Sequence, residues 1–430
     1  MSAMSAESVE QIANVVLYEG YLLYPYSRSA TKNQQRWTFG GVYPRRYSEG
    51  SGGADPWFMQ TQCLVAADST DAGASGDSVR EATLEVKVRF LQVVDRTVAE
   101  RLVQLSSSNL AATEPATKVA WQGTDTEVTL QTSLGNLSQH VLAQPMDARP
   151  AASPDEGAAE WRVVEELRVG EHVHRPWEEA IEREVLIGGS GDEPLRLGAL
   201  VGRGRRHAFS IPTGCADEPL RDPEGNVVGR LVREWQALQG VVEIAAEPLA
   251  EGSMDAAVAG AGYRLTVRVV NTAPWTWPHG EGDPRSRGAA LRRTLVSTHT
   301  ILRVRGGAFV SLLEPPAAYQ AAAEGCENVK TWPVLAGAEG ERQTLLSSPI
   351  ILYDYPQIAP ETTGDLFETT EIDELLTLSI MTLTDEEKQA MRESDPRGRD
   401  VLERTEALTS EQLMKLHGAI RGLQPARRED

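Results

Sequence analysis

The sequence predicts an α+β protein that is mainly β, with antiparallel β-sandwich domains followed by a small C-terminal helical segment. Three observations predict this class. Short segments of alternating apolar and polar residues recur as far as Leu313, and glycine- and proline-containing turns separate them. Helix-start signals then gather after Thr370.

We expect three regions in the 430 residues. Residues 1–145 form a β-rich domain with an aromatic and basic segment, residues 158–347 a β-sandwich-like region, and residues 348–430 an extended segment followed by helices. Three prolines within residues 144–157 mark the seam between the first two regions.

The first elements are less regular than those that follow. The apolar run within Val9–Tyr26 is consistent with a short helix that enters an extended segment, because Pro25 disfavours helix at the residue before it. Residues Trp37–Pro44 are typical of a strand and a turn. Thr83–Val94 is the clearest early strand, since apolar even-numbered residues alternate with charged odd-numbered ones.

The strongest sheet signal lies further along the chain. GVVEIAAEPL and YRLTVRVVNTAPW, between residues 240 and 275, are expected to belong to an antiparallel β-sandwich. In Thr294–Leu313, Gly306 and Gly307 predict a two-residue hairpin turn. The GGSGDEP sequence after Ile187 lacks the ending of a phosphate-binding loop, and a hairpin loop is expected there.

The C-terminal helices are predicted from their first residues. Thr384 with Glu387 forms a capping box, in which each side chain satisfies a backbone donor of the first turn, and Asp395–Pro396 is a further start signal. A second capping box, Thr409 with Gln412, opens the last helix.

Composition narrows the function classes. The net charge of −20 argues against general nucleic-acid binding, which depends on neutralising phosphates. The three cysteines lie far apart in the sequence, so no cysteine metal site, disulfide framework or other cofactor is predicted. With no signal peptide and no apolar run long enough to span a membrane, the expected location is the cytoplasm.

His172 and His174 are the candidate metal ligands. On a strand, positions i and i+2 share one face, so both imidazoles could reach one ion. No third ligand is identifiable in the sequence; His207 and His299 are candidates by residue type alone. Two exposed strand histidines are the alternative interpretation.

An aromatic and basic segment lies near the N-terminus. Six of the ten tyrosines fall between Tyr18 and Tyr47, among arginines and with a single acidic residue. Such side chains are typical of recognition surfaces. The candidate partner-binding residues are Tyr21, Tyr24 and Trp37 as apolar anchors and Arg28, Arg36 and Arg45 as charged hydrogen-bond donors. The alternative is that the tyrosines at 18, 21 and 24 form a helical stripe that packs into the core, while Arg28, Arg36 and Arg45 form salt bridges with acidic residues of the chain.

Two strings at the ends of the chain carry a family resemblance. LYEGYLLYPYSRSATKNQQRWTFGGVYP (Leu17–Pro44) and the segment Ser348–Asp395, which begins SPIILYDYPQIAPE, resemble an uncharacterised bacterial family associated with gene clusters for nickel–iron hydrogenases. The stretch Val267–Leu313 resembles it more weakly. The resemblance implies an accessory or maturation role for a hydrogenase, and it assigns no functional residue.

The function expected from these observations is that of a non-enzymatic accessory, maturation or assembly protein. Its partner would be a nickel–iron hydrogenase subunit or a maturation factor. Two alternatives are a metal-dependent enzyme that uses His172 and His174, and a structural subunit of a larger complex.

Overall fold

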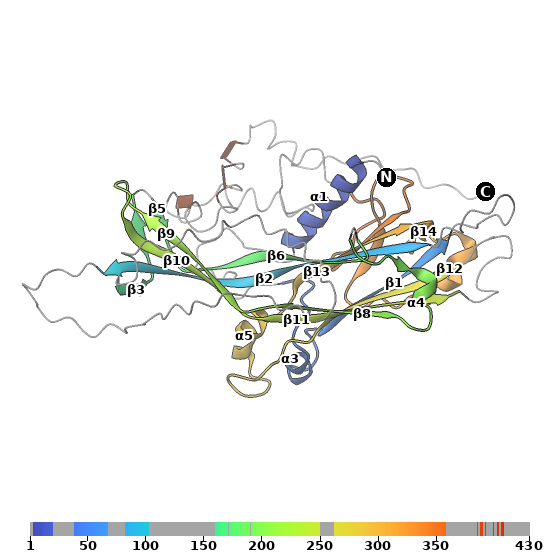
Figure 1. The fold of residues 1–430 in the computed structure, drawn as a ribbon, viewed down its shortest axis with the longest axis horizontal. Helices are drawn as coiled ribbons and strands as arrows, with labels where there is room; N and C mark the ends of the chain where they lie inside the picture. The colour runs from blue at the N-terminus through green and yellow to red at the C-terminus, as the bar shows by residue number, and fades with distance from the viewer. Residues whose placement is uncertain are drawn as a thin grey trace, which may run out of the picture. The chain divides into compact units, whose positions relative to one another are not determined.

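A computed structural model describes seven ranges of the chain and a few single positions near the C-terminus (Figure 1). The ranges are 3–19, 38–67, 82–102, 160–170, 172–189, 191–249 and 262–357. The chain divides into two compact units, one of residues 1–21 and 38–356 and the other of residues 22–37 and 357–430. The first unit is built mainly from antiparallel sheets, so the predicted fold class is confirmed.

One sheet of the sandwich has five strands. In spatial order they are β14 (Gly307–Val310), β1 (Phe58–Ala67), β12 (Gly262–Asn271), β11 (Leu238–Pro248) and β8 (Arg205–Ile211). The two strongest strand signals are both strands of this antiparallel sheet, and the structure makes β11 and β12 neighbours, with Val242 opposite Val269.

The second sheet is organised around β2 (Thr83–Leu102), which runs through much of its length (Figure 1). On one edge β2 pairs with β13 (Val296–Arg305) and then with β10 (Val227–Trp235). The other edge pairs with β7 (Leu195–Arg196), β6 (Trp177–Ile187) and β3 (Glu160–Val164). The sheet continues to β16 (Thr344–Ser348) and β15 (Trp332–Leu335) beyond β13 and to β9 (Gly214–Arg221) beyond β10.

The core lies between the two sheets, and the alternation in the sequence explains it. The even-numbered residues of the first half of β2 face the five-stranded sheet and are fully buried there with apolar side chains of β1, β11 and β12. Full burial of such a side chain contributes roughly 1.5–3 kcal/mol. This row comprises Leu84, Val86, Val88 and Phe90.

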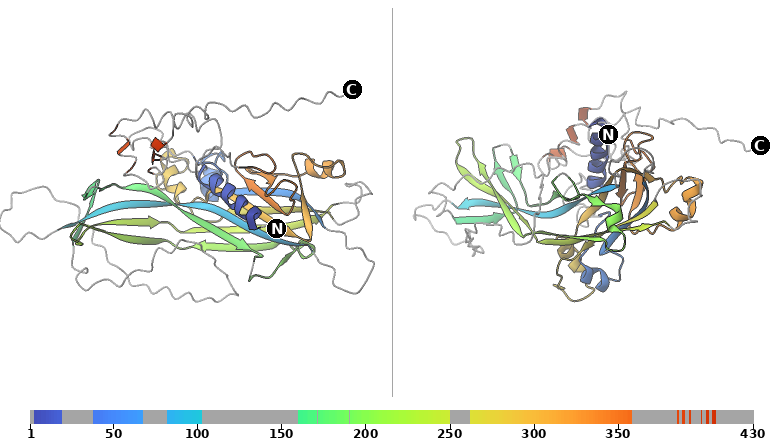
Figure 2. Two further views of the ribbon diagram at one scale, coloured as in Figure 1. Left: turned by 90° about the horizontal axis from the view of Figure 1, so that it is seen from above. Right: turned by 45° about the vertical axis from the view of Figure 1, so that its right-hand side comes forward.

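The opposite face of β2 is charged and is covered by a helix. The helix α1 (Ala3–Glu19) lies over this sheet (Figure 2). Its residues Val9, Ile12, Ala13 and Val16 recur at helical spacing and are buried. Glu10 reaches three cations of that face, with Lys87 at 2.9 Å, Arg303 at 3.2 Å and Arg89 at 3.5 Å.

Those cations decide the charge of Glu10. Burial alone would raise the pKa of this carboxyl group, but the hydrogen bond from Lys87 and the charges of the three cations hold it below its usual value. The helix therefore carries an ionised carboxylate onto a basic patch of the sheet.

Three local predictions are wrong. Gly306 and Gly307 do not form a hairpin, because β13 and β14 belong to different sheets and β14 pairs with β1. The GGSGDEP sequence does not close a hairpin, because β6 and β7 run in the same direction as each other and both pair antiparallel with β2. In residues 38–44, Thr38 and Val42 form only isolated bridges, the second with Leu295, so this stretch is not a continuous strand.

The second unit is described at single positions only. Residues 385, 388, 389, 392, 399, 402, 403, 406 and 407 are helical, within the segments predicted to be helices. Glu406 pairs with Arg392 at 2.6 Å and with Lys388 at 3.6 Å. The capping residues Thr384, Glu387, Asp395, Thr409 and Gln412 lie outside the described residues.

Candidate functional site

The described part of the aromatic and basic segment divides between core and surface. Tyr43 and Tyr47 are buried, and the Tyr47 ring centroid lies 5.4 Å from that of Tyr43. It also lies 5.4 Å from the ring of Trp275 and 5.3 Å from that of Trp277. We call Tyr43, Tyr47, Trp275 and Trp277 the buried aromatic cluster. Tyr43 and Tyr47 therefore belong to the core, whereas the side chains of Tyr18, Tyr21 and Tyr24 lie outside those that the structure describes.

The hydroxyl groups of Tyr43 and Tyr47 in the buried aromatic cluster lie next to an ion pair. Arg287 pairs with Asp55 and donates a hydrogen bond to the Tyr43 hydroxyl oxygen at 3.0 Å. Burial raises the pKa of Tyr43 to about 12, which the hydrogen bond with Thr38 and the nearby Arg287 charge only partly oppose. Tyr43 is therefore a neutral, structural side chain at physiological pH.

Arg45 is the one candidate partner-binding residue within the described ranges. It opens the short helix α3 (Arg45–Gly50), is exposed, forms an ion pair with Glu49 at 2.7 Å and lies 4.6 Å over the Trp57 ring. A partner would have to compete with these contacts. Tyr21, Tyr24, Arg28, Arg36 and Trp37 lie outside the described residues, and their partner-binding role stays a prediction.

The two candidate metal ligands lie on a small ribbon. His172 and His174 are the first and last residues of β5 (His172–His174), which pairs with β4 (Leu167–Val169). His172 is exposed, His174 is half-buried and Val173 between them is buried, so the two histidines share the less buried face. Among the described residues, no group of three or more His, Cys, Asp or Glu side chains could hold a metal ion. The metal site stays a prediction.

The two strings that carry the family resemblance meet in the first unit. Gly40 has φ +58°, and a Cβ added there would lie 2.5 Å from the Pro349 side chain, so the proline ring leaves no room for a side chain at position 40. Thr298 fixes the position by donating its backbone N–H to the Gly40 carbonyl at 2.9 Å. Residues far apart in the sequence thus form one junction.

The segment after Pro349 is attached to the edge strand β15. The backbone N–H of Tyr355 donates to the Leu335 carbonyl at 2.7 Å, and the Leu335 N–H donates to the Asp354 carboxylate at 2.7 Å. Ser348 lies opposite Trp332, the first residue of β15, and Tyr355 is hydrogen-bonded to Leu335, the last residue of β15. Residues 349–355 therefore run along β15 in the same direction as that strand. The edge strand and this segment therefore form one continuous surface.

Large apolar side chains remain exposed around this junction. Their exposed fractions are 50% for Phe39, 43% for Trp332, 71% for Ile351 and 86% for Tyr353. We call these four residues the junction surface. In the sequence this surface corresponds partly to the apolar run SPIILYDYP. Apolar and polar residues do not alternate in that run, so it does not predict which side chains face solvent.

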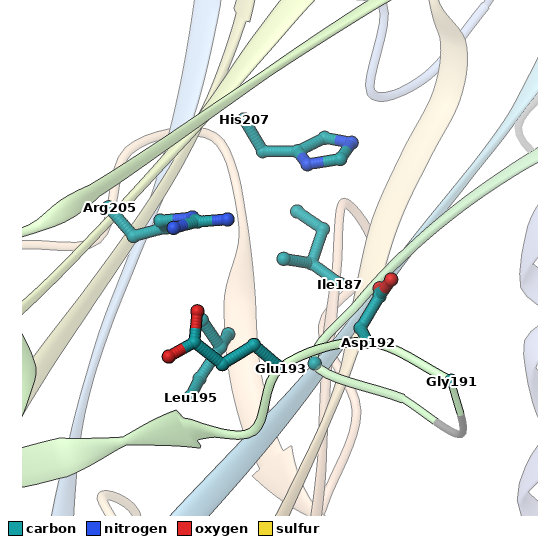
Figure 3. A pocket seen from close by; sticks show the side chains of 8 residues that line it. Ile187, Gly191, Asp192, Glu193, Leu195, Arg205 and His207 are labelled. Carbon is teal, nitrogen blue, oxygen red and sulfur yellow. The ribbon is translucent and has the colours of Figure 1, made fainter. Parts of the chain in front are cut away.

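A pocket of about 280 Å³ lies elsewhere in the first unit (Figure 3). Arg205 and His207 project from β8 on one side, and Asp192 and Glu193 project from the loop after β6 on the other (Figure 3). Ile187 and Leu195 supply its apolar surface. Of the two histidines considered as further metal ligands, His207 lines this pocket, whereas His299 is buried and contacts the Ser297 carbonyl through Nδ1 at 3.0 Å.

Comparisons with known proteins supply no relative. No protein-family model, curated protein or solved structure matches the chain. Within the described residues, no helix is long and apolar enough to cross a membrane.

Proposed function

We propose that the chain is a non-enzymatic accessory or assembly protein that binds a hydrogenase subunit or a related maturation partner through the junction surface. One observation carries the proposal: Phe39, Trp332, Ile351 and Tyr353 are exposed where the two strings of the family resemblance meet. Exposed apolar side chains that gather at one place are typical of protein–protein contact sites.

The backbone beneath the junction surface supports this role. The Gly40–Pro349 contact and the hydrogen bonds at Leu335 hold the exposed side chains on fixed segments. A preformed surface loses less conformational entropy when a partner binds. Aromatic side chains in such a position act as anchors that fill pockets of the partner.

The partner class comes from the resemblance. Phe39 belongs to the first string, and Ile351 and Tyr353 belong to the second. The net charge of −20 favours a partner whose contact surface is basic, because complementary potentials speed association. Tyr21, Arg36 and Trp37 of the first string remain predicted partner contacts.

Affinity purification from the native host tests the proposal. The double variant Trp332→Ala and Tyr353→Ala should recover at least about tenfold less hydrogenase subunit, since truncating an anchor residue commonly costs 2 kcal/mol or more of binding. Its melting temperature should stay near that of the wild type, because both side chains are exposed.

A matched control separates binding from general surface effects. Val163 on β3 is 49% exposed, and its strand pairs with the other end of β2. Val163→Ala should recover the partner like the wild-type protein. Undiminished recovery by the double variant, or the absence of any hydrogenase component from the purified material, would contradict the proposal.

A further inference from the structure

The loop between β6 and β7 is an excursion from one interrupted strand. Ile187, the last residue of β6, lies opposite Val86, and β7 resumes the pairing when Leu195 lies opposite Leu84. The intervening chain therefore leaves the edge of β2 and returns to it. We call residues 188, 189 and 191–194 the excursion loop.

Glycine is required where the excursion loop begins. Gly188 has φ +75°, and a Cβ added there would lie 2.7 Å from the Leu84 carbonyl oxygen and 2.9 Å from the Leu195 side chain. The loop is thus held tightly against β2 at its base, while Asp192 and Glu193 extend beyond it.

The facing wall is the edge strand β8. Phe209 points between the sheets, with its ring 5.8 Å from that of Phe90. Because side chains two residues apart share a face, His207 and Arg205 continue this inward row toward the excursion loop. Figure 3 shows both side chains directed into the pocket.

The pocket presents opposite charges on its two walls. Two carboxylates stand on the excursion loop, and the Arg205 guanidinium stands on β8. Burial lowers the pKa of His207, an effect that Asp192 opposes and Arg205 adds to, so the imidazole is neutral at physiological pH. Among the described residues, none forms an ion pair with the Arg205 side chain.

We propose that this pocket binds a small zwitterion with an apolar side chain, in the class of the apolar α-amino acids. The ligand carboxylate pairs with Arg205, its ammonium group with Asp192 and Glu193, and its side chain packs on Ile187 and Leu195. A simple anion would meet two carboxylates and a simple cation would meet Arg205. A ligand that carries both charges matches both walls.

Isothermal titration of the full chain with L-leucine, L-methionine and L-phenylalanine tests the proposal. At least one should bind with a dissociation constant on the order of 1 mM or tighter, as expected for ligands with so few non-hydrogen atoms. The 4-methylpentanoate ion lacks the ammonium group and 3-methylbutylamine lacks the carboxylate. Each should bind roughly tenfold or more weakly than leucine, because each loses one charge-assisted contact.

Variants assign the binding to this pocket. Arg205→Gln and Asp192→Asn should each weaken binding of the best ligand by about tenfold or more. Arg206→Gln is the matched control, because Arg206 is the next residue of β8, lies on its other face and is exposed. It should bind like the wild type.

Three results would overturn the proposal. They are no heat of binding with any of the three amino acids, binding of either single-charge analogue as tight as that of leucine, and an equal loss of affinity in Arg206→Gln and Arg205→Gln. The proposal is independent of partner binding. The Trp332→Ala and Tyr353→Ala double variant should therefore keep wild-type affinity for the amino acid, so failure of one proposal leaves the other intact.

Discussion

The buried aromatic cluster and the junction surface use the same kinds of side chain for opposite purposes. Tyr43 is 2% exposed and packs in the first, whereas Phe39, only a few residues earlier, is 50% exposed in the second. Tyr47 and Trp275 stack edge to face at 5.4 Å, while Trp332 and Tyr353 present much of their surface to solvent.

This difference shows what aromatic enrichment in a sequence can mean. Full burial of a large apolar side chain contributes roughly 1.5–3 kcal/mol to folding, and a partly exposed ring contributes less, in proportion to the surface that it leaves in water. The rings of the buried aromatic cluster are therefore explained by stability. The exposed parts of the junction surface are not explained in this way, and partner binding is the function proposed for them.

The largest expected effect is a loss of stability when the buried aromatic cluster is disrupted. Trp275→Ala should lower the free energy of unfolding by about 3–5 kcal/mol, because it leaves a cavity beside Tyr47 and Trp277. Urea unfolding followed by circular dichroism measures the change.

Trp275→Phe is the matched control for that cavity. It keeps a ring in the cluster and removes an indole N–H that is buried without a hydrogen-bond partner among the described residues. The free energy of unfolding lost in Trp275→Phe should be clearly smaller than that lost in Trp275→Ala. Equal losses in the two variants would mean that packing of the ring is not what stabilises this region.

A smaller effect is expected where the two regions are joined. Gly40→Ala should cost about 1–3 kcal/mol, because alanine is strained at φ +58° and its Cβ would collide with Pro349. It should also weaken partner recovery, since Phe39 would be displaced. The measurements are urea unfolding and the affinity purification described above.

Gly52→Ala separates the two causes. Gly52 also has a positive φ, +86°, but an added Cβ there would meet no atom within 4 Å. The free energy of unfolding lost in Gly52→Ala should reflect the backbone strain alone, and recovery of the partner should be unchanged. If both variants lose the same stability, the contact between Gly40 and Pro349 does not hold the junction together.

Much of the sheet structure follows from the sequence. The alternation in Thr83–Val94 predicts a strand with one apolar face, and β2 has that face in the core. The two strongest strand signals are β11 and β12, which the structure makes neighbours. The sequence of β2 does not predict that a helix covers its charged face. The alternating pattern is the same whether its cations face solvent or pair with Glu10 of α1, as they do here.

Connections were harder to predict than strands. Gly306 permits a tight turn, but whether the next strand stays in the same sheet depends on distant partners, here Leu64 opposite Val310 of β14. The same holds for the glycines after Ile187, where pairing with β2 continues in the same direction beyond the loop.

The candidate site was predicted only in outline. Local composition identified an aromatic region, and Tyr43 and Tyr47 show that part of it belongs to the core. The junction surface combines Phe39 with Trp332 and Tyr353, and the contact of Gly40 with Pro349 that joins these segments depends on the fold. No local pattern marks side chains that come together in this way.

The smallest effect concerns one hydroxyl group of the buried aromatic cluster. Tyr43→Phe should cost about 1 kcal/mol near neutral pH, because it removes the hydrogen bond that Arg287 donates at 3.0 Å. The pKa of Tyr43 is raised to about 12 in the folded protein, above its ordinary value of 10.0. The stability linked to its neutral form is thus complete below pH 10 and is lost as the pH rises toward 12.

Urea unfolding at a series of alkaline pH values measures this loss. The wild-type protein should lose stability more steeply than Tyr43→Phe across that interval, because the unfolded phenol ionises first and stabilises the unfolded state. Tyr353→Phe is the matched control, since its ring is 86% exposed, and its slope should follow that of the wild type. If Tyr353→Phe flattens the slope and Tyr43→Phe does not, the assignment of one ring to the core and the other to a free surface is reversed.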